Sequence, residues 1–221
     1  MAITLSTGAT VSVAKTYSPA LGSPGVANTA LTNANPCVVS SAGHTLSVGD
    51  YVQMSSGWGL LDQRVVRVQA VSAGVSFTLE GVDTSDTSKY PVGTGTGSHR
   101  EITAWSQLSQ VKSVSASGGA QQFADITSIA DTVIRQIPTV KDAVNMTIDV
   151  FDDPTLAWYA DVVAADTART PYGLLMTFPN GSKLVANSYW SIMKVPTMET
   201  NQALMSQITL SYAAEPLRYA T

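Results

Sequence analysis

The chain has 221 residues, of which 13% are charged and 7% are aromatic, and its formal net charge is −4. A chain of this length can bury one good core, or one core with a small satellite. The Lys and Arg residues are scattered, which argues against a protein built to grip nucleic acid. Such low charge is unusual for a freely diffusing enzyme and suits a protein that hides much of its surface in subunit contacts. An ordinary Ser- and Thr-rich β domain is the alternative explanation.

Cys37 is the single cysteine, so an internal disulfide is excluded and a reducing compartment is expected. We interpret it as a small buried apolar residue rather than a reactive thiol. Residues 1–6 lack the basic start and long apolar core of a signal peptide, and the apolar runs fall well short of about 18 residues. We therefore expect no membrane insertion.

The N-terminal segment predicts a strand followed by a linker. Residues 3–14 favour one strand, because Val11 and Val13 alternate with polar residues. Residues 18–35 are rich in Pro, Gly, Ala, Asn and Ser without any period, which indicates a long loop. We assign residues 1–35 to a strand and linker that belong to a larger core.

Residues 36–104 predict a small inserted β domain, a barrel or a sandwich. Short runs rich in β-branched residues alternate with turns that contain Gly and Asp. The polar, Gly-rich residues 83–98 are expected to close this unit as a loop. The predicted strands are Val38–Val39, Ser47–Met54, Arg64–Val71 and Val75–Leu79.

Residues 105–221 are assigned to the main core. A strand is expected over residues 102–119, ending in a break, and residues 120–131 are expected to form a long loop. Residues 144–150 and 207–214 each show a clean alternation of apolar and polar residues, which predicts two half-buried strands.

The only convincing helix is expected over about residues 154–166. Asp is a preferred N-cap and Pro is tolerated at the first helical position, so Asp153 and Pro154 are expected to begin the helix. Asp161 is placed on its polar face. The apolar face is expected to consist of Leu156, Tyr159, Ala160 and Val163.

A hairpin is expected between residues 172 and 192, with Asn180 and Gly181 as the two positive-φ residues of its turn. The predicted fold class is therefore mainly β, with one packed helix and a small inserted β domain.

Candidate chemical sites have ordinary structural explanations. His44 and His99 occur in turn-like contexts, and neither a Gly-x-Ser-x-Gly elbow nor a cysteine-nucleophile signature is present. Asp149, Asp152 and Asp153 could suggest a cation site, but helix capping and the polar face of a strand explain them better. We assign no catalytic, cofactor or metal residues and do not expect an enzyme.

Two further motifs are treated in the same way. Residues 93–97 alternate Gly and Thr, but the helix N-terminus or Lys of a phosphate loop does not follow them, so we interpret them as a flexible loop. Trp58 lies in a Gly-rich turn and could stack on a sugar, although buried packing is the favoured interpretation.

The order of these elements resembles the tail tube proteins of lambda-type, long-tailed bacteriophages. The resemblance covers the first strand and residues 102–214, and depends on the Trp105–Lys112 segment, the Asp-Pro helix and the Phe-Pro-Asn-Gly hairpin. It implies hexameric rings that stack into a hollow tube, whose lumen conducts the viral genome. A tape-measure protein, tail terminator and distal tail proteins are the implied partners, and the implied location is the virion, after assembly in the host cytoplasm.

Two other interpretations stay open. The chain could be a phage tail decoration or receptor-binding module, in which residues 36–104 touch a ligand. It could also be the tube subunit of a contractile injection or type VI-like system, which the tail tube resembles in architecture.

Overall fold

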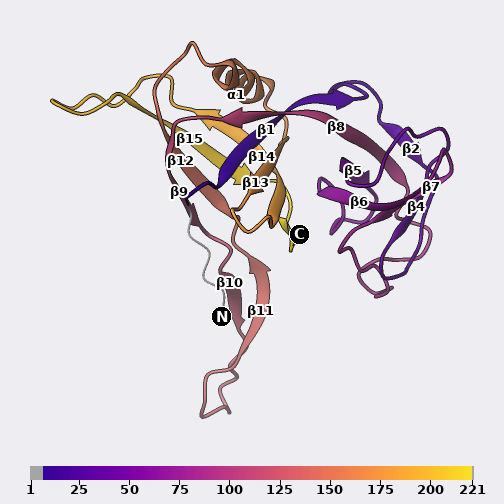
Figure 1. Cartoon of the computed structure of the whole chain (residues 1–221). Helices are drawn as coiled ribbons and strands as arrows, with labels where there is room; N and C mark the ends of the chain where they lie inside the picture. The colour runs from indigo at the N-terminus through magenta and orange to yellow at the C-terminus, as the bar shows by residue number, and fades with distance from the viewer. Residues whose placement is uncertain (1–6, 221) are drawn as a thin grey trace.

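The computed structural model describes residues 7–220, within which strands predominate and a single α-helix is present. The expected fold class, mainly β with one packed helix, is confirmed. The strands form two lobes and a protruding hairpin, as Figure 1 shows.

The core lobe contains the helix α1 (Ala157–Ala168) and the strands β1 (Thr10–Ser18), β9 (Val111–Ser117), β12 (Asn145–Phe151), β13 (Tyr172–Thr177), β14 (Lys183–Ile192), β15 (Met205–Tyr212) and β16 (Leu217–Tyr219). The barrel lobe contains β2 (Val26–Asn28), β3 (Ala30–Leu31), β4 (Val38–Ser40), β5 (Tyr51–Ser56), β6 (Val65–Ser72) and β7 (Ser76–Leu79). The long strand β8 (Gly97–Leu108) belongs to both lobes, and the hairpin consists of β10 (Gln121–Asp125) and β11 (Gln136–Lys141).

One antiparallel sheet runs through both lobes in the order β3-β4-β7-β6-β5-β8-β1-β13-β14-β15-β12-β9. Strand β8 makes this continuity possible: its residues 97–102 pair with β5, and its residues 101–108 pair with β1. The single strand expected over residues 102–119 is wrong, because Gln110 adopts a φ of 62° and separates β8 from β9. The expected break after that strand is confirmed at Gly118 and Gly119, which both have positive φ.

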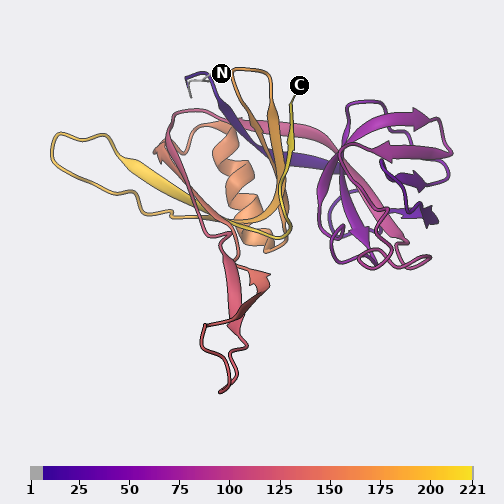
Figure 2. The same ribbon diagram turned by 90° about the horizontal axis from the view of Figure 1, so that it is seen from below.

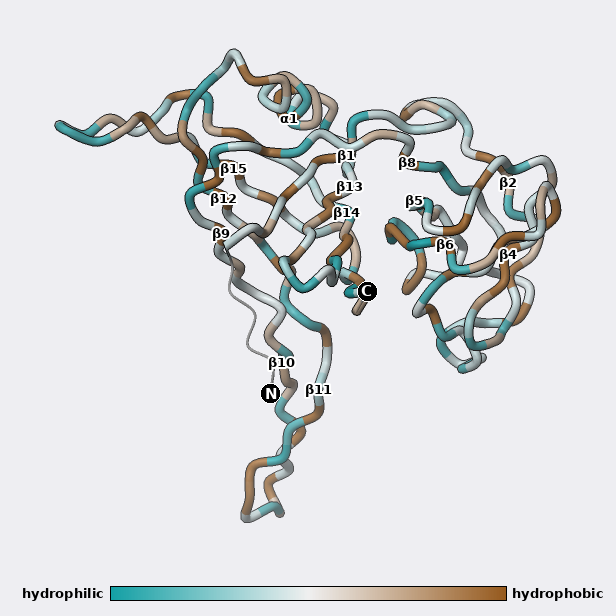
Figure 3. Tube along the Cα trace, viewed as in Figure 1, coloured by the Kyte–Doolittle hydropathy of each residue, from teal (hydrophilic) through white to brown (hydrophobic). Residues whose placement is uncertain are grey.

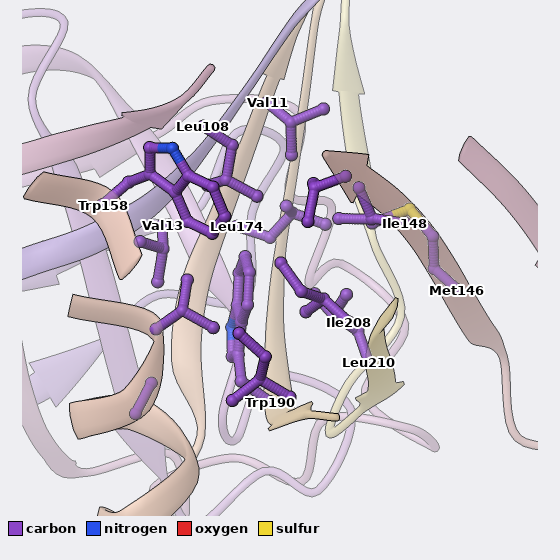
Figure 4. Close-up of a cluster of buried hydrophobic side chains, with 14 of the residues drawn as sticks. Val11, Val13, Leu108, Met146, Ile148, Trp158, Leu174, Trp190, Ile208 and Leu210 are labelled. Carbon is purple, nitrogen blue, oxygen red and sulfur yellow. The ribbon is translucent and has the colours of Figure 1, made fainter. Parts of the chain in front are cut away.

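The alternating strands predicted over residues 144–150 and 207–214 are confirmed as β12 and β15, which pair in register from Asn145↔Ser211 to Phe151↔Met205. Their apolar residues face the main buried cluster, which α1 covers (Figures 2 and 4). Members of this cluster include Val11, Val13, Met146, Ile148, Trp158, Val162, Leu174, Trp190, Ile208 and Leu210.

The start of the helix differs from the prediction. Leu156, with an extended backbone, is the N-cap, and its side chain makes no capping hydrogen bond. Asp153 instead accepts hydrogen bonds from the backbone N–H and the hydroxyl of Thr155, at 3.0 and 2.6 Å. The Asp-Pro pair therefore builds a local turn before the helix. The helix ends at Ala168, with Arg169 in the left-handed conformation.

The predicted apolar face of the helix is also wrong. Trp158, Val162 and Ala165 are the buried residues, and they lie one step around the helix from the predicted stripe. Leu156, Tyr159 and Val163 are partly buried at the margin of the contact, whereas Ala160 is exposed. Asp161 is not a free polar-face residue, because its carboxylate lies 3.3 Å from the Lys15 ammonium.

The expected hairpin is confirmed as the pair β13–β14. Its turn differs, because Gly181 has a φ of 82° while Asn180 is not among the positive-φ residues. The N–H of Gly181 donates to the Phe178 carbonyl at 2.9 Å, so the turn begins at Phe178. Pro179 presets the second residue of this turn, and a following left-handed Gly is typical of a three-residue hairpin with a bulge.

Three expected irregular or extended segments are reassigned. Residues 18–35 contain β2 and β3, which pair with β8 and β4, so this segment is not a simple linker. Residues 120–131 contain β10 rather than a loop alone. The strand expected over residues 3–14 begins at Thr10 and continues to Ser18, and residues 3–6 lie outside the described residues.

The barrel lobe closes on itself. β2 pairs with β8, β3 pairs with β4, and only Thr29 separates β2 from β3. The strands predicted over residues 36–79 are confirmed as β4 to β7, with small shifts of their ends. Their inward side chains form a second buried cluster, which includes Cys37, Val39, Met54, Trp58, Leu61, Val66, Phe77 and Leu79.

A third buried cluster joins the two lobes. Tyr219 in β16 is its centre, because its hydroxyl accepts the Arg67 N–H at 2.8 Å and the Arg67 guanidinium lies 4.6 Å from its ring centroid. Burial raises the pKa of Tyr219, which keeps the phenol neutral. The buried members of the cluster are Ala14, Tyr51, Val65, Ile102, Val185 and Tyr219.

We predict that Val162→Asp unfolds the core lobe. Val162 is 0% exposed, so the substitution places an unpaired carboxylate in the main cluster, at a cost on the order of several kcal/mol. Urea unfolding measured by tryptophan fluorescence would show the loss. The matched control is Ala164→Asp on the exposed side of the same helix, which should change the unfolding midpoint little. Equal effects of both substitutions would contradict the packing described for α1.

We also predict that the barrel lobe loses stability in mild acid. Burial, aided by repulsion from His44, lowers the pKa of His99 from 6.5 to about 4. His99 therefore binds a proton more readily in the unfolded chain than in the folded one. The folding free energy that neutral His99 contributes above pH 6.5 is lost as the pH falls towards 4. The loss is on the order of 3 kcal/mol.

Urea unfolding midpoints measured from neutral pH down to about pH 4 would test the prediction. His99→Gln, which keeps a polar partner for Asn28, should flatten the pH dependence, because the wild-type ring shares a 2.7 Å hydrogen bond with the Asn28 side chain. An unchanged slope in the variant would show that other groups cause the acid sensitivity.

Candidate assembly surfaces

Trp58 and the Gly-rich residues 93–97, the two motifs considered in the barrel lobe, have packing roles. Trp58 is buried as favoured, and its indole N–H donates to the Pro91 carbonyl at 2.9 Å. Gly95 lies against the indole ring, where an added Cβ would come within 2.6 Å of the ring atoms. Residues 93–96 therefore form a loop that leads into β8 at Gly97, and glycine allows a close approach within it.

The titratable residues considered from the sequence lie apart or make local bonds. Asp149 accepts hydrogen bonds from Ser113 and Gln207, and Asp152 accepts one from Ser206 at 2.6 Å. No group of three His, Cys, Asp or Glu side chains in residues 7–220 has an arrangement that could hold a metal ion. Cys37 is fully buried, as expected, and burial raises the pKa of its thiol.

The β10–β11 hairpin is the first protruding element, and its strand β10 lies in a segment that was expected to be a loop. It extends away from both lobes, and Figure 3 shows apolar positions along it. Asp125 begins its tip by accepting the Thr127 N–H at 2.8 Å, and the hydrogen bonds from Thr127 lower the pKa of Asp125. The exposed apolar residues are Phe123, Ile126, Ile129, Val133, Ile134, Ile137 and Val140.

The second protruding element is residues 193–204, named here the arm, which connects β14 to β15 (Figure 2). Thr197 and Met205 form an isolated antiparallel bridge near its base. Its tip is a turn, in which the Gln202 N–H donates to the Glu199 carbonyl at 3.2 Å. Its exposed apolar residues are Met193, Val195, Met198 and Leu204.

Strand β9 forms an edge of the sheet between these two elements. Among the described residues it pairs only with β12, so its other backbone edge has no strand partner. All of its residues after Val111 are exposed. An edge of this kind can accept another strand.

The sheet face opposite α1 is polar near this edge. Register places Ser113 beside Asp149 on β12, and Asp149 beside Gln207 on β15. Asp149 is the charged residue within this face, and Lys112 lies at its margin, where its Nζ is 3.3 Å from the Met205 Sδ. The face otherwise carries mainly hydroxyl and amide groups, with the Tyr189 ring beside them and Phe151 and Met205 at one end. The remaining members are Ser115, Ser117, Asn145, Thr147, Ser191, Thr209 and Ser211.

These features describe a structural β protein with apolar extensions. A family model described as phage tail tube protein, TTP, matches residues 56–221, and the chain belongs to this family. It is therefore a subunit of a phage tail tube and a component of the virion, in a family known as structural rather than enzymatic. The match includes residues 102–214, on which the sequence resemblance depended, but not the first strand.

A comparison with curated proteins gives no match. Among solved structures, a chain of the anti-feeding prophage baseplate is 8% identical with a TM-score of 0.40, covering 53% of this chain and 85% of that chain. A chain of the anti-feeding prophage tube-terminating cap is 19% identical, with a TM-score of 0.38 and coverages of 52% and 83%. A chain of the extracellular contractile injection system PVC sheath/tube terminator is 15% identical, with a TM-score of 0.37 and coverages of 48% and 84%. TM-scores at this level do not establish a shared fold.

No helix in the described part of the chain has the length and apolar character that crossing a membrane requires.

We predict that the hairpin tip is dispensable for folding and required for association. Replacing Ile129, Val133 and Ile134 with Ser removes exposed apolar surface and leaves the buried clusters intact. The urea midpoint should therefore stay close to wild type, while sedimentation velocity should show weaker association. A triple substitution that lowers the midpoint strongly would mean that the hairpin packs on its own chain.

Proposed function

We propose that the chain forms hexameric rings, which stack into the hollow tail tube of a lambda-type, long-tailed phage, and that the lumen conducts the genome during ejection. The observation that carries the proposal is the unpartnered edge of β9, in a chain that belongs to the tail tube family. Joining sheets across copies would remove edges that otherwise promote uncontrolled aggregation.

The polar face of the sheet suits the lumen. Hydroxyl and amide side chains dominate it, and the carboxylate of Asp149 is already hydrogen-bonded to Ser113 at 2.6 Å. Lys112 is the basic residue at the margin of this wall, where its Nζ lies 3.3 Å from the Met205 Sδ, and a net charge of −4 for the chain favours passage of DNA rather than binding.

The β10–β11 hairpin suits the contact between stacked rings. It extends from the core lobe, and its apolar side chains have no partner within residues 7–220 that would bury them. Burying about seven such side chains against another copy would supply hydrophobic free energy that the isolated chain lacks. A ribbon without a core of its own would then become ordered by its neighbour.

The barrel lobe suits the outside of the tube, because its strands close on themselves and need no partner. We propose the division 1–35, 36–104 and 105–221 for the N-terminal segment, the outer unit and the tube core, with β2 and β3 of the N-terminal segment completing the barrel of the outer unit. The tape-measure protein would occupy the lumen before DNA does. Tail terminator and distal tail proteins would bind the two ends, and assembly would occur in the host cytoplasm.

Negative-stain microscopy of the purified chain at high concentration tests the proposal, and rings or tubes with six-fold symmetry are expected. Ala116→Lys places a charge on the exposed edge strand β9, which should block pairing with another copy and abolish the rings. The control is Ala164→Lys on the exposed side of α1. A wild-type chain that stays monomeric at high concentration, even with tail assembly factors present, would contradict the tube.

A further inference from the structure

A cleft of about 230 Å³ lies where the barrel lobe meets the segment that follows α1. Strands β5 and β8 supply one wall, and the turn after β1, the loop between β5 and β6, and the residues between α1 and β13 supply the rest. The lining residues used here are Gln53, Ser55, Arg100, Thr170 and Pro171.

Two polar side chains of this cleft are incompletely satisfied. Arg100 donates from Nη2 to the Ser23 carbonyl, but its buried Nε has no hydrogen-bond partner, and no carboxylate in residues 7–220 forms an ion pair with it. Gln53 is 6% exposed, and its Nε2 donates to the Pro171 carbonyl at 3.4 Å, while its Oε1 has no partner. Because buried polar groups normally find partners, the Nε–H of Arg100 lacks an acceptor and the Oε1 of Gln53 lacks a donor.

The missing chemistry is a carboxylate beside an amide. Guanidinium groups bind carboxylates through charge-assisted hydrogen bonds, and the carbonyl oxygen of Gln53 requires an N–H. The tip of the arm carries this pair, since Glu199 is followed by Asn201 and Gln202. Glu199 lies in the turn at residues 199–202 and forms no ion pair with the described residues, although it lines a pocket that Lys112 also lines.

The arm does not reach the cleft of its own chain, because the arm and the barrel lobe lie on opposite sides of the core lobe (Figures 1 and 2). A contact between the arm of one copy and the cleft of another is therefore head-to-tail. Such heterologous contacts close into a ring when the rotation between copies allows it.

We propose that the cleft is a carboxylate-binding site that receives the arm tip of a second copy, with Glu199 on Arg100 and a neighbouring amide on Gln53. This proposal rests on the proposed function, for which it names a contact between adjacent subunits of a ring. In this contact, the neighbouring copy would also bury exposed apolar residues of the arm, such as Met198 and Leu204.

Disulfide trapping in the full chain tests the contact directly. Thr170→Cys at the cleft and Thr200→Cys at the arm tip, combined in one chain, should give a ladder of covalent oligomers on a non-reducing gel. The control pair replaces Thr170→Cys with Val48→Cys, on an exposed barrel turn outside the cleft. Cys37 stays in place, because it is fully buried. A ladder no stronger than that of the control pair overturns the proposal.

Charge exchange tests the pairing of Glu199 with Arg100. Glu199→Arg should weaken association about ten- to a hundredfold, and adding Arg100→Glu should restore it. Urea midpoints check that each variant folds, and Glu199→Arg lies on the exposed arm, away from the buried clusters. A double variant no better than the folded single variants overturns the pairing.

Microscopy of the wild-type chain separates this proposal from the one on which it rests. Rings without cross-linking would leave the tube intact and place the subunit contact elsewhere, so the cleft proposal would be wrong. Cross-linking that persists at full yield in Glu199→Gln would instead show that the arm docks without its carboxylate, which also overturns the assigned chemistry. Absence of both rings and cross-links would contradict both proposals.

Discussion

Strand β8 pairs with strands of both lobes, and the arrangement of the lobes depends on this constraint. Its first half pairs with β5 and its second half with β1, so no flexible linker separates the barrel lobe from the core lobe. The close approach of Gly97 to the Ser55 carbonyl, where a Cβ would come within 2.1 Å, shows how tightly the first half is held. Tyr219 then fixes the second connection through its hydrogen bond from Arg67. Together these contacts make the cleft at Arg100 a preformed feature of the fold.

The placement of apolar side chains separates stability from association. The buried clusters use the inward faces of the strands and of α1, and they hold the large residues such as Trp158, Trp190 and Phe77. The hairpin and the arm carry a second set of apolar residues that contribute little to the fold of their own chain. A protein that functioned alone would expose this surface to aggregation. In a tail tube subunit the same residues have a use, because neighbouring copies can cover them.

Local patterns predicted the parts of the fold whose signal is contained in a few adjacent residues. Residues 144–150 alternate with a period of two, and that pattern suffices to define β12 and its buried face. The face of α1 was misjudged because Leu156, taken as the first member of the stripe, precedes the helix, and because Trp158 and Val162 form a competing pair at i, i+4 that is the one actually buried. Strands β2 and β3 are too short to show a period, and they exist because β8 and β4 pair with them. Pairing between residues far apart in the chain cannot be deduced from composition.

The candidate surfaces were harder to predict than the fold, because a surface completed by another copy has no internal partner to reveal it. Ile129, Val133 and Ile137 recur at helical spacing, yet the segment forms a hairpin, so its local period is misleading. Apolar residues in a segment expected to be a loop are themselves a signal of an external contact. Arg100 gave no signal at all, since its lack of a carboxylate partner depends on how the two lobes meet. Information about association therefore lies in what the folded chain leaves unsatisfied: the edge of β9, the apolar hairpin, and a cation facing a cleft. Each of these would be costly in a monomer, and we propose that another copy of the same chain satisfies each of them.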